Sequence, residues 1–230
     1  SALHSLAARA AKLCKADLAT DMVGEFPELQ GVMGGVYAKH AGEPEEVWKA
    51  IYHHYQPIGV EADAPPSIDA LGKAKATWAC VSLADKLDTL VGLFKAGEKP
   101  TGSRDPFGMR RAAQGVVKVL ADLPSLGVRG HDLDSLIEQA FAGYLKDGES
   151  RDDWKKLPVF DFLSERLQHL LERRGYAANV AAVVRGFAQH PTVALERAEA
   201  LRQELARPGN ELPALGELYK RACNITKGVA

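Results

Sequence analysis

The sequence predicts an all-α protein made of two helical bundles in tandem. Leucine, valine and alanine recur at three- and four-residue spacing, which places them on one face of a helix. No stretch shows the alternation of apolar and polar residues that a half-buried strand would require. Glycine and proline gather between the periodic stretches, where loops are expected.

The first bundle begins with a helix predicted over residues 3–23, whose apolar stripe includes Leu18. A second helix begins at residues 42–46, because proline and acidic residues are favoured in a first helical turn. Its buried stripe continues to Tyr55 and it ends before Pro57. Residues 56–67 contain three prolines and a glycine and are predicted to be a loop.

A long helix follows this loop, with one narrow apolar stripe formed by Leu83, Leu87, Leu90, Val91 and Phe94. After a second glycine- and proline-rich loop, Asp105 and Pro106 make a favourable N-cap and first-position pair for a helix over residues 109–120. One more amphipathic helix, with Ile137 and Phe141 on its apolar face, precedes a polar break at residues 148–153. We place a domain boundary there, which gives domains at 1–147 and 154–230.

The second bundle continues the helical spacing with apolar stripes at residues 160–171, 180–187 and 195–205. Gly209 and Asn210 mark a turn before a short last helix at 215–225. The chain opens on Ser1 without an initiator methionine and enters a helical pattern at once. We therefore expect it to be an internal part of a longer protein.

Composition restricts the class of protein. The net charge of −1 does not by itself indicate a nucleic-acid-binding protein, so any RNA contact has to be made by a local basic patch. The three cysteines are far apart and outside metal-binding spacing, which predicts neither disulfides nor a zinc site and favours the cytoplasm. No apolar run is long enough to span a bilayer. No G-x-G-x-x-G or P-loop motif is present, so nucleotide binding through such a loop is not expected.

Two carboxylates could carry chemistry. Asp17 lies on or beside the apolar stripe of the first helix, where an ionised carboxylate needs a partner. Asp85 points away from the leucine stripe of the long helix. The two could meet as ligands of a metal, or each could cap a backbone group or pair with a lysine or arginine. The second interpretation is favoured, because metal and catalytic sites normally need more ligands.

Histidines offer weaker signals. His53 and His54 end a helix and, being adjacent, cannot both face one metal from the same helical face. We expect both to be surface histidines. Asp132, after His131, is predicted to be a helix N-cap.

The most basic local stretch lies around the loop that precedes residue 109, where a proline-bounded loop enters a helix N-terminus. Such a loop can place arginine side chains and backbone donors on phosphates. The alternative is a solvated helix end, with Glu98 and Asp105 opposing the cations. The candidate phosphate-contacting residues are Lys95, Lys99, Arg104, Arg110 and Arg111. A second basic set, interleaved with acids, is expected to be a solvated face and consists of Arg166, Arg173, Arg174 and Arg185.

Several strings of the first half form an ordered series: Lys15–Leu18, Asp21–Gly31, His54–Pro57, Leu83–Gly92, Pro100–Phe107 and Arg110–Ala113. Taken together, they closely resemble the central region of bacterial glycyl-tRNA synthetase β-subunits. In the second half Val159–Leu163, Arg166–Leu167 and Tyr219–Ile225 are similar to later segments of the same family.

The resemblance implies a tRNA-binding accessory role. In that family the α-subunit holds glycine, ATP and the adenylation chemistry with Mg²⁺, and the β-subunit supplies modules that bind tRNA-Gly. No catalytic residue, metal or cofactor is therefore expected in this chain, and its partners would be the α-subunit and tRNA-Gly.

The first half resembles a degenerate HD-type helical domain, and the rest resembles the helical body and an incomplete anticodon-binding region. Asp85 lies in a segment similar to the later-aspartate helix of HD phosphohydrolases. The string Lys15-Ala16-Asp17, however, contains no His-Asp doublet. Two other functions remain open: a metal-dependent phosphohydrolase built on Asp17 and Asp85, and a scaffold that contacts only protein.

Overall fold

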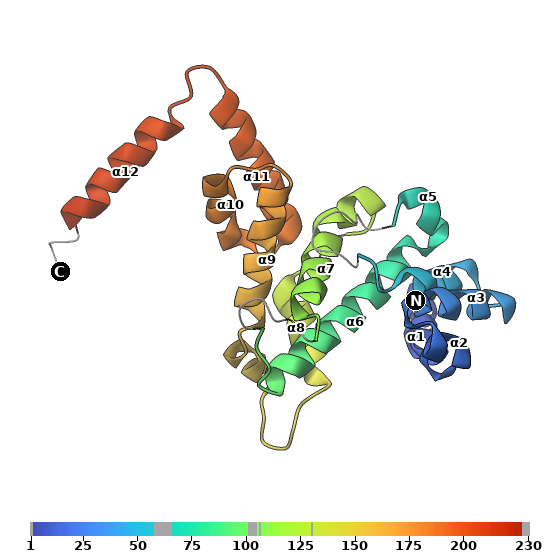
Figure 1. Ribbon diagram of the computed structural model, residues 1–230. Coiled ribbons are helices and arrows are strands. Elements are labelled where there is room, and N and C mark those ends of the chain that lie inside the picture. Colours follow the sequence, from blue (N-terminus) through green and yellow to red (C-terminus); the bar gives the residue numbers. More distant parts are fainter. Residues whose placement is uncertain (1, 58–65, 101–104, 106, 130, 227–230) are drawn as a thin grey trace.

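The computed structural model describes residues 2–57, 66–100, 105, 107–129 and 131–226, and within these ranges it contains helices and no strand. The predicted all-α class is confirmed. No helix among these residues combines the length and the apolar character that crossing a bilayer requires. The molecule is elongated, with the chain's first helices at one side and its last helix at the other (Figure 1).

The N-terminal group packs four α-helices and two short 3-10 turns together. They are α1 (Ala2–Leu13), η1 (Ala16–Ala19), α2 (Asp21–Glu25), η2 (Pro27–Leu29), α3 (Val32–His40) and α4 (Glu45–His53). The α3 and α4 backbones approach closely because α3 carries Gly35. A Cβ added there would lie 2.4 Å from Cβ and 2.8 Å from Cα of Tyr52 on α4. Glycine is thus required at this crossing.

The long helix α6 (Lys75–Lys95) is the central element, and α5 (Ile68–Leu71) and η3 (Gly72–Ala74) lead into it. It packs against α1 and α4 on one side and against α7 (Met109–Asp122) and α8 (Leu133–Ala142) on the other. The predicted stripe is confirmed, because its five residues from Leu83 to Phe94 are all at most 6% exposed.

The C-terminal group rests on the same core. The turn η4 (Leu123–Leu126) follows α7, and η5 (Arg151–Lys156) follows α8. The helix α9 (Val159–Arg173) packs on α7, with α10 (Ala178–Val184), η6 (Arg185–Phe187) and α11 (Pro191–Ala206) around it. One cluster of buried residues runs from Ala10 to Ala198. The division into domains 1–147 and 154–230 stays a prediction.

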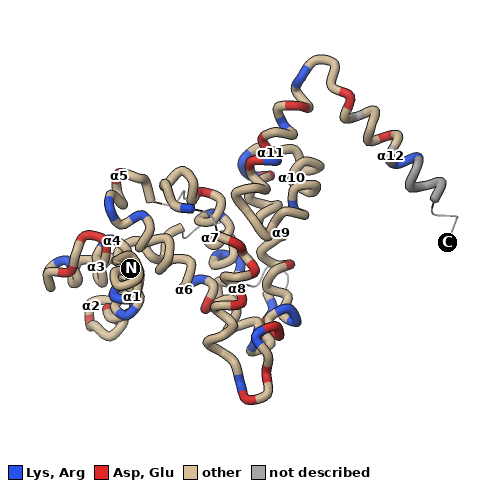
Figure 2. The backbone as a smooth tube through the Cα atoms, turned by 180° about the vertical axis from the view of Figure 1, so that it is seen from behind, with Lys and Arg blue, Asp and Glu red and all other residues tan. Residues whose placement is uncertain are grey.

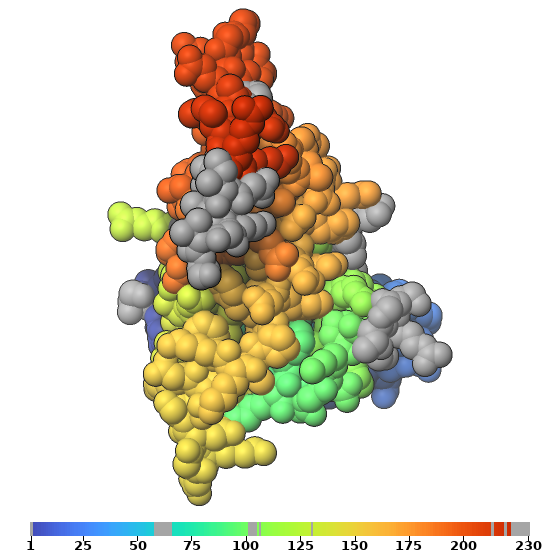
Figure 3. Space-filling model, turned by 90° about the vertical axis from the view of Figure 1, so that its left-hand side faces the viewer, coloured from blue at the N-terminus to red at the C-terminus, as the bar shows by residue number. Residues whose placement is uncertain are grey.

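The two ends of the C-terminal group are far apart. Figure 3 shows the polar segment between α8 and η5 at one extremity of the molecule and the corner between α11 and the last helix, α12 (Leu212–Thr226), at the other. In Figure 1, α12 extends away from the remaining helices. Its Leu215 and Leu218 are 55% and 60% exposed.

Two predicted boundaries are wrong. The single helix at 3–23 is interrupted after Leu13 and restarts at α2, because the Thr20 hydroxyl oxygen accepts a hydrogen bond from Val23 N–H and caps a new helix. Leu18 is consequently 50% exposed. The N-cap of α7 is Gly108 and not Asp105, although Asp105 Oδ2 still accepts a hydrogen bond from Arg110 N–H at 3.0 Å.

Candidate functional site

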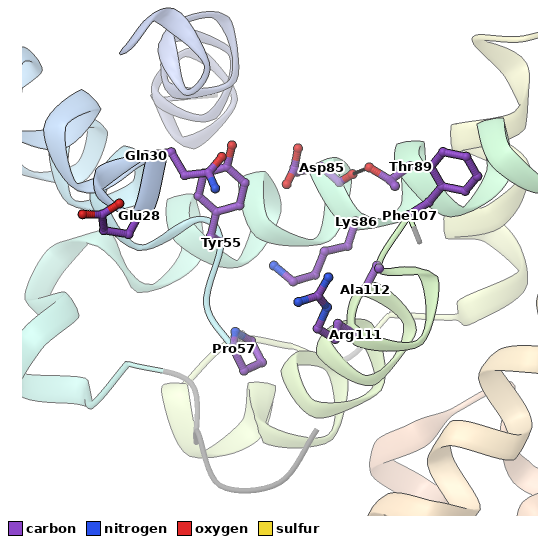
Figure 4. Close-up of a pocket in the computed structure, with 11 residues that line it drawn as sticks. Glu28, Gln30, Tyr55, Pro57, Asp85, Lys86, Thr89, Phe107, Arg111 and Ala112 are labelled. Carbon is purple, nitrogen blue, oxygen red and sulfur yellow. Dashed lines mark hydrogen bonds between the residues drawn. The ribbon is translucent and has the colours of Figure 1, made fainter. Parts of the chain in front are cut away.

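A pocket of about 590 Å³ opens where the end of α4, the middle of α6 and the start of α7 meet (Figure 4). Its wall combines aromatic rings, two cationic side chains and several hydrogen-bonding groups. The lining residues are Glu28, Gln30, Tyr55, Pro57, Asp85, Lys86, Thr89, Phe107, Gly108, Arg111 and Ala112. Four stretches of the sequence, at residues 28–30, 55–57, 85–89 and 107–112, therefore build one site.

The ammonium of Lys15 contacts two residues of the pocket wall, Tyr55 and Asp85. Lys15 Nζ lies 2.9 Å from Asp85 Oδ1, 3.1 Å from His54 Nε2 and 3.8 Å from the centre of the Tyr55 ring. We call Lys15, His54, Tyr55 and Asp85 the Lys15 cluster. Burial lowers the pKa of Lys15, but its interactions with Tyr55 and Asp85 outweigh burial and hold that pKa above its ordinary value. The cluster therefore contains a permanent cation.

The imidazole of His54 is enclosed, with no exposed surface. Its Nδ1 lies 2.6 Å from the Ile51 carbonyl oxygen, which can only accept, so Nδ1 donates and Nε2 presents its lone pair to Lys15. Burial, reinforced by the charge of Lys15, lowers the pKa of His54 to about 4. The expectation of a surface histidine is wrong here. The signal was visible, since His54 continues the Val47–Ile51 stripe at helical spacing.

A second lysine is buried in the adjacent wall. Lys86 is 6% exposed, and its ammonium donates to the Ser82 hydroxyl and to the carbonyl oxygens of His54 and Gln56 at 2.9, 2.9 and 3.3 Å. Burial lowers its pKa to about 8. Lys86 thus ties the turn after α4 to α6. Its place three residues after Leu83 and four before Leu90 could have indicated burial, but sequence reasoning missed it.

Asp17 and Asp85 have separate partners. Asp17 is 1% exposed, and its Oδ2 accepts hydrogen bonds from Gly31 N–H at 2.6 Å and Gly34 N–H at 3.0 Å, which caps the N-terminus of α3. Asp85 pairs with Lys15. These are the backbone-capping and ion-pair roles that the non-catalytic interpretation predicted. The described residues hold no group of three or more His, Cys, Asp or Glu able to bind a metal.

Comparison with known proteins identifies the family. A sequence model described as "Glycyl-tRNA synthetase beta subunit" matches residues 1–186. This chain belongs to that family. Proteins called "Glycine--tRNA ligase beta subunit" from Aromatoleum aromaticum and Ralstonia nicotianae are each 44% identical over 96% of this chain, and that from Thiobacillus denitrificans is 43% identical over 98%. The chain spans about 30% of the length of these relatives.

The predicted phosphate-contacting residues lie in different surroundings. Lys95 is enclosed, since its ammonium pairs with Glu149 and lies 4.5 Å from the centre of the Phe141 ring. Lys99 and Arg111 are exposed and Arg110 is half-buried. Arg104 lies outside the described residues. Among the four members that the structure describes, Arg111 alone lines the pocket.

The second basic set is partly structural. Arg174 Nη2 lies 2.6 Å from Asp122 Oδ1 and so joins α9 to the end of α7, and Arg185 Nε donates to the Ser164 hydroxyl at 3.0 Å. Along α11, positions of Lys and Arg are interspersed with those of Asp and Glu (Figure 2). Neither arrangement offers the local excess of positive charge that phosphate binding requires.

Proposed function

We propose that this chain is a tRNA-facing, non-catalytic part of the beta subunit of a two-subunit glycine–tRNA ligase. Family membership over residues 1–186 carries the proposal. In it, glycine activation with ATP and Mg²⁺ belongs to the α-subunit, and this chain helps to hold tRNA-Gly for transfer in the cytoplasm. The proposal agrees with the structural roles of Asp17 and Asp85, which are engaged with backbone amides and with Lys15.

The proposed RNA contact is the surface of Lys99, Arg110 and Arg111, which we call the α6–α7 edge. Arg111 is exposed and makes no ion pair with any residue that the structure describes. Guanidinium groups suit phosphate oxygens because their planar donors match phosphate geometry. The nearby Asp105 carboxylate already accepts Arg110 N–H and is held against the protein.

A salt titration of tRNA-Gly binding tests this surface. Arg110→Ala combined with Arg111→Ala should weaken binding and flatten the dependence of log K on log salt by about 0.7 to 0.9 for each phosphate that is no longer neutralised. Arg129→Ala is the matched control, because Arg129 is exposed beyond the opposite end of α7. It should leave the slope unchanged.

An unchanged slope in the double variant would remove the α6–α7 edge from the RNA interface. Equal weakening by Arg129→Ala would show that general positive charge, and not this edge, accounts for binding. Complete absence of tRNA binding at low salt would count against the tRNA-facing role itself.

A second candidate function, a protein-binding scaffold, is favoured by α12. Leu215 and Leu218 are exposed three residues apart on this projecting helix, so they share one face. If the chain acts mainly as a scaffold, Leu215→Ser with Leu218→Ser should abolish capture of the α-subunit and leave tRNA affinity unchanged. If the same double variant weakened tRNA binding and left capture of the α-subunit unchanged, the result would support the tRNA-facing role.

A further inference from the structure

The geometry points to the pocket beside α6 as a binding site for one unpaired RNA nucleotide, with its phosphate on Arg111 and its base against Phe107. This inference rests on the proposed tRNA contact, which it narrows to this pocket and to unpaired nucleotides. Arg111 and Phe107 both line the pocket, and they come from the α7 start and the loop just before it.

The size of the pocket fits a single nucleotide. Its volume of about 590 Å³ lies within the range of roughly 300 to 1,000 Å³ that is typical of small-molecule sites. A base in a duplex is held inside the stack and cannot enter such a pocket unless it is unpaired and turned outward. The pocket therefore selects single-stranded positions, such as loops and chain ends.

The anion contact comes from the guanidinium of Arg111. A Cβ placed on Gly108 would lie 3.1 Å from Arg111 Nη2, so this side chain folds back over the start of α7. Asp105 Oδ2 already accepts the Arg110 N–H, so this amide is engaged, and the guanidinium of Arg111 is the charged donor that the pocket offers to a phosphate. Figure 4 shows Arg111 directed into the same space as Lys86.

The base platform comes from Phe107, which is 52% exposed. Single-stranded nucleic acids bind where an exposed aromatic ring stacks on a base and a cationic side chain contacts the backbone, and this pocket is lined by both Phe107 and Arg111. Tyr55 lines the pocket too, but the Lys15 ammonium lies 3.8 Å from the centre of its ring. Tyr55 is thus already engaged by a cation, and Phe107 is the aromatic side chain left for a base.

The two acidic side chains of the pocket do not prevent an anion from binding near Arg111. The charge of Asp85 is balanced by Lys15 at 2.9 Å. In Figure 4, Glu28 and Phe107 lie at opposite ends of the pocket, so Glu28 is removed from the proposed stacking platform. Gln30 and Thr89 supply neutral groups that can bond ribose hydroxyls or base edges.

Binding of an eight-nucleotide single-stranded RNA, and of the same RNA annealed to its complement, tests the inference. Phe107→Ala should weaken binding of the single strand by about fivefold to 150-fold, the range that loss of one base–aromatic stack produces, and leave duplex binding within about twofold. Phe107→Tyr should restore single-strand binding, because it keeps a ring. The matched control is Phe187→Ala, since Phe187 is another exposed phenylalanine, lies against Arg197 and does not line the pocket.

An unchanged preference for single strand over duplex in Phe107→Ala would overturn the inference. If tRNA binding still depended on Arg111 in that case, the proposed function would stand without the pocket. The inference would also be overturned if Phe187→Ala weakened single-strand binding as much as Phe107→Ala does. Binding of an octaglutamate peptide as tight as that of the single-stranded RNA would overturn the inference as well. Failure to bind either RNA or tRNA would overturn the inference and the proposed function together.

Discussion

The Lys15 cluster and the α6–α7 edge contain the same kinds of charged side chain in opposite surroundings. In the cluster, one ammonium contacts a carboxylate, an imidazole and an aromatic ring within the protein. At the edge, the guanidinium of Arg111 is exposed and has no ion pair among the described residues. Arg111 lines the same pocket as Tyr55 and Asp85 of the cluster, so these side chains differ in their partners although they lie in one site.

The comparison separates structural charges from charges available to a ligand. A buried ionic group that loses its partner costs several kcal/mol, so such groups are satisfied within the fold and change stability when altered. Removing an exposed arginine changes the stability of the fold little, but it weakens binding to a phosphate ligand. Variants in the N-terminal group should therefore change unfolding, and variants at the edge should change RNA affinity.

The largest effect is expected at Asp17. Asp17→Ala removes the acceptor of two buried backbone amides, Gly31 N–H and Gly34 N–H. Hydrogen bonds to charged groups contribute about 1.5 to 3 kcal/mol each, so the free energy of unfolding should fall by about 4 kcal/mol. Urea denaturation measures this loss. Asp21→Ala, at an exposed position in the first turn of α2, is the control and should cost less than about 1 kcal/mol. Similar losses in both variants would contradict the capping role.

The next effect is a pH dependence from His54. Its folded pKa is about 4, against 6.5 for an ordinary histidine, so between these values the unfolded chain binds a proton that the folded chain does not. Stability therefore rises with pH across this window and is lost as pH falls from about 6.5 to 4, by up to about 3 kcal/mol. The variant His54→Gln does not titrate in this window, so its free energy of unfolding should fall less steeply as the pH is lowered from about 6.5 to 4.

The control for the pH dependence is His40→Gln, because His40 is exposed. Unfolding free energies measured from pH 7 to pH 4 should give parallel curves for the wild type and the control. A His54→Gln curve parallel to both would show that His54 does not control acid stability.

The periodicity of the sequence predicts those features that neighbouring residues determine, namely which face of a helix is buried and which residue caps it. The buried stripe of α6 follows from five apolar residues on one helical face, and all five are buried. Asp132 is predicted as an N-cap and accepts a hydrogen bond from Asp134 N–H. The sequence also predicts that Asp17 needs a partner, but from the stripe of a helix that in the structure ends at Leu13, and it does not identify the backbone amides whose hydrogen bonds Asp17 accepts.

The Lys15 cluster could not be predicted in the same way. Its members lie at positions 15, 54, 55 and 85, and only the packing of α1 and α4 on α6 brings them together. The sequence also groups all five candidate phosphate-contacting cations together, because charge patterns do not show which of them pairs with a carboxylate of the same chain. Lys95 pairs with Glu149, and Arg111 is not so engaged among the described residues.

The smallest expected effect is the coupling between Lys15 and Asp85. Their side chains are 39% and 20% exposed, so solvent screens part of their attraction. A double-mutant cycle with Lys15→Met and Asp85→Asn should give a coupling free energy of about 1 kcal/mol. The same cycle on Lys155 and Asp152, which are 63% and 75% exposed, should give a value close to zero although the pair is only 2.6 Å apart. Equal coupling in the two pairs would mean that enclosure does not strengthen the Lys15 pair, and the contrast between cluster and edge would then rest on His54 alone.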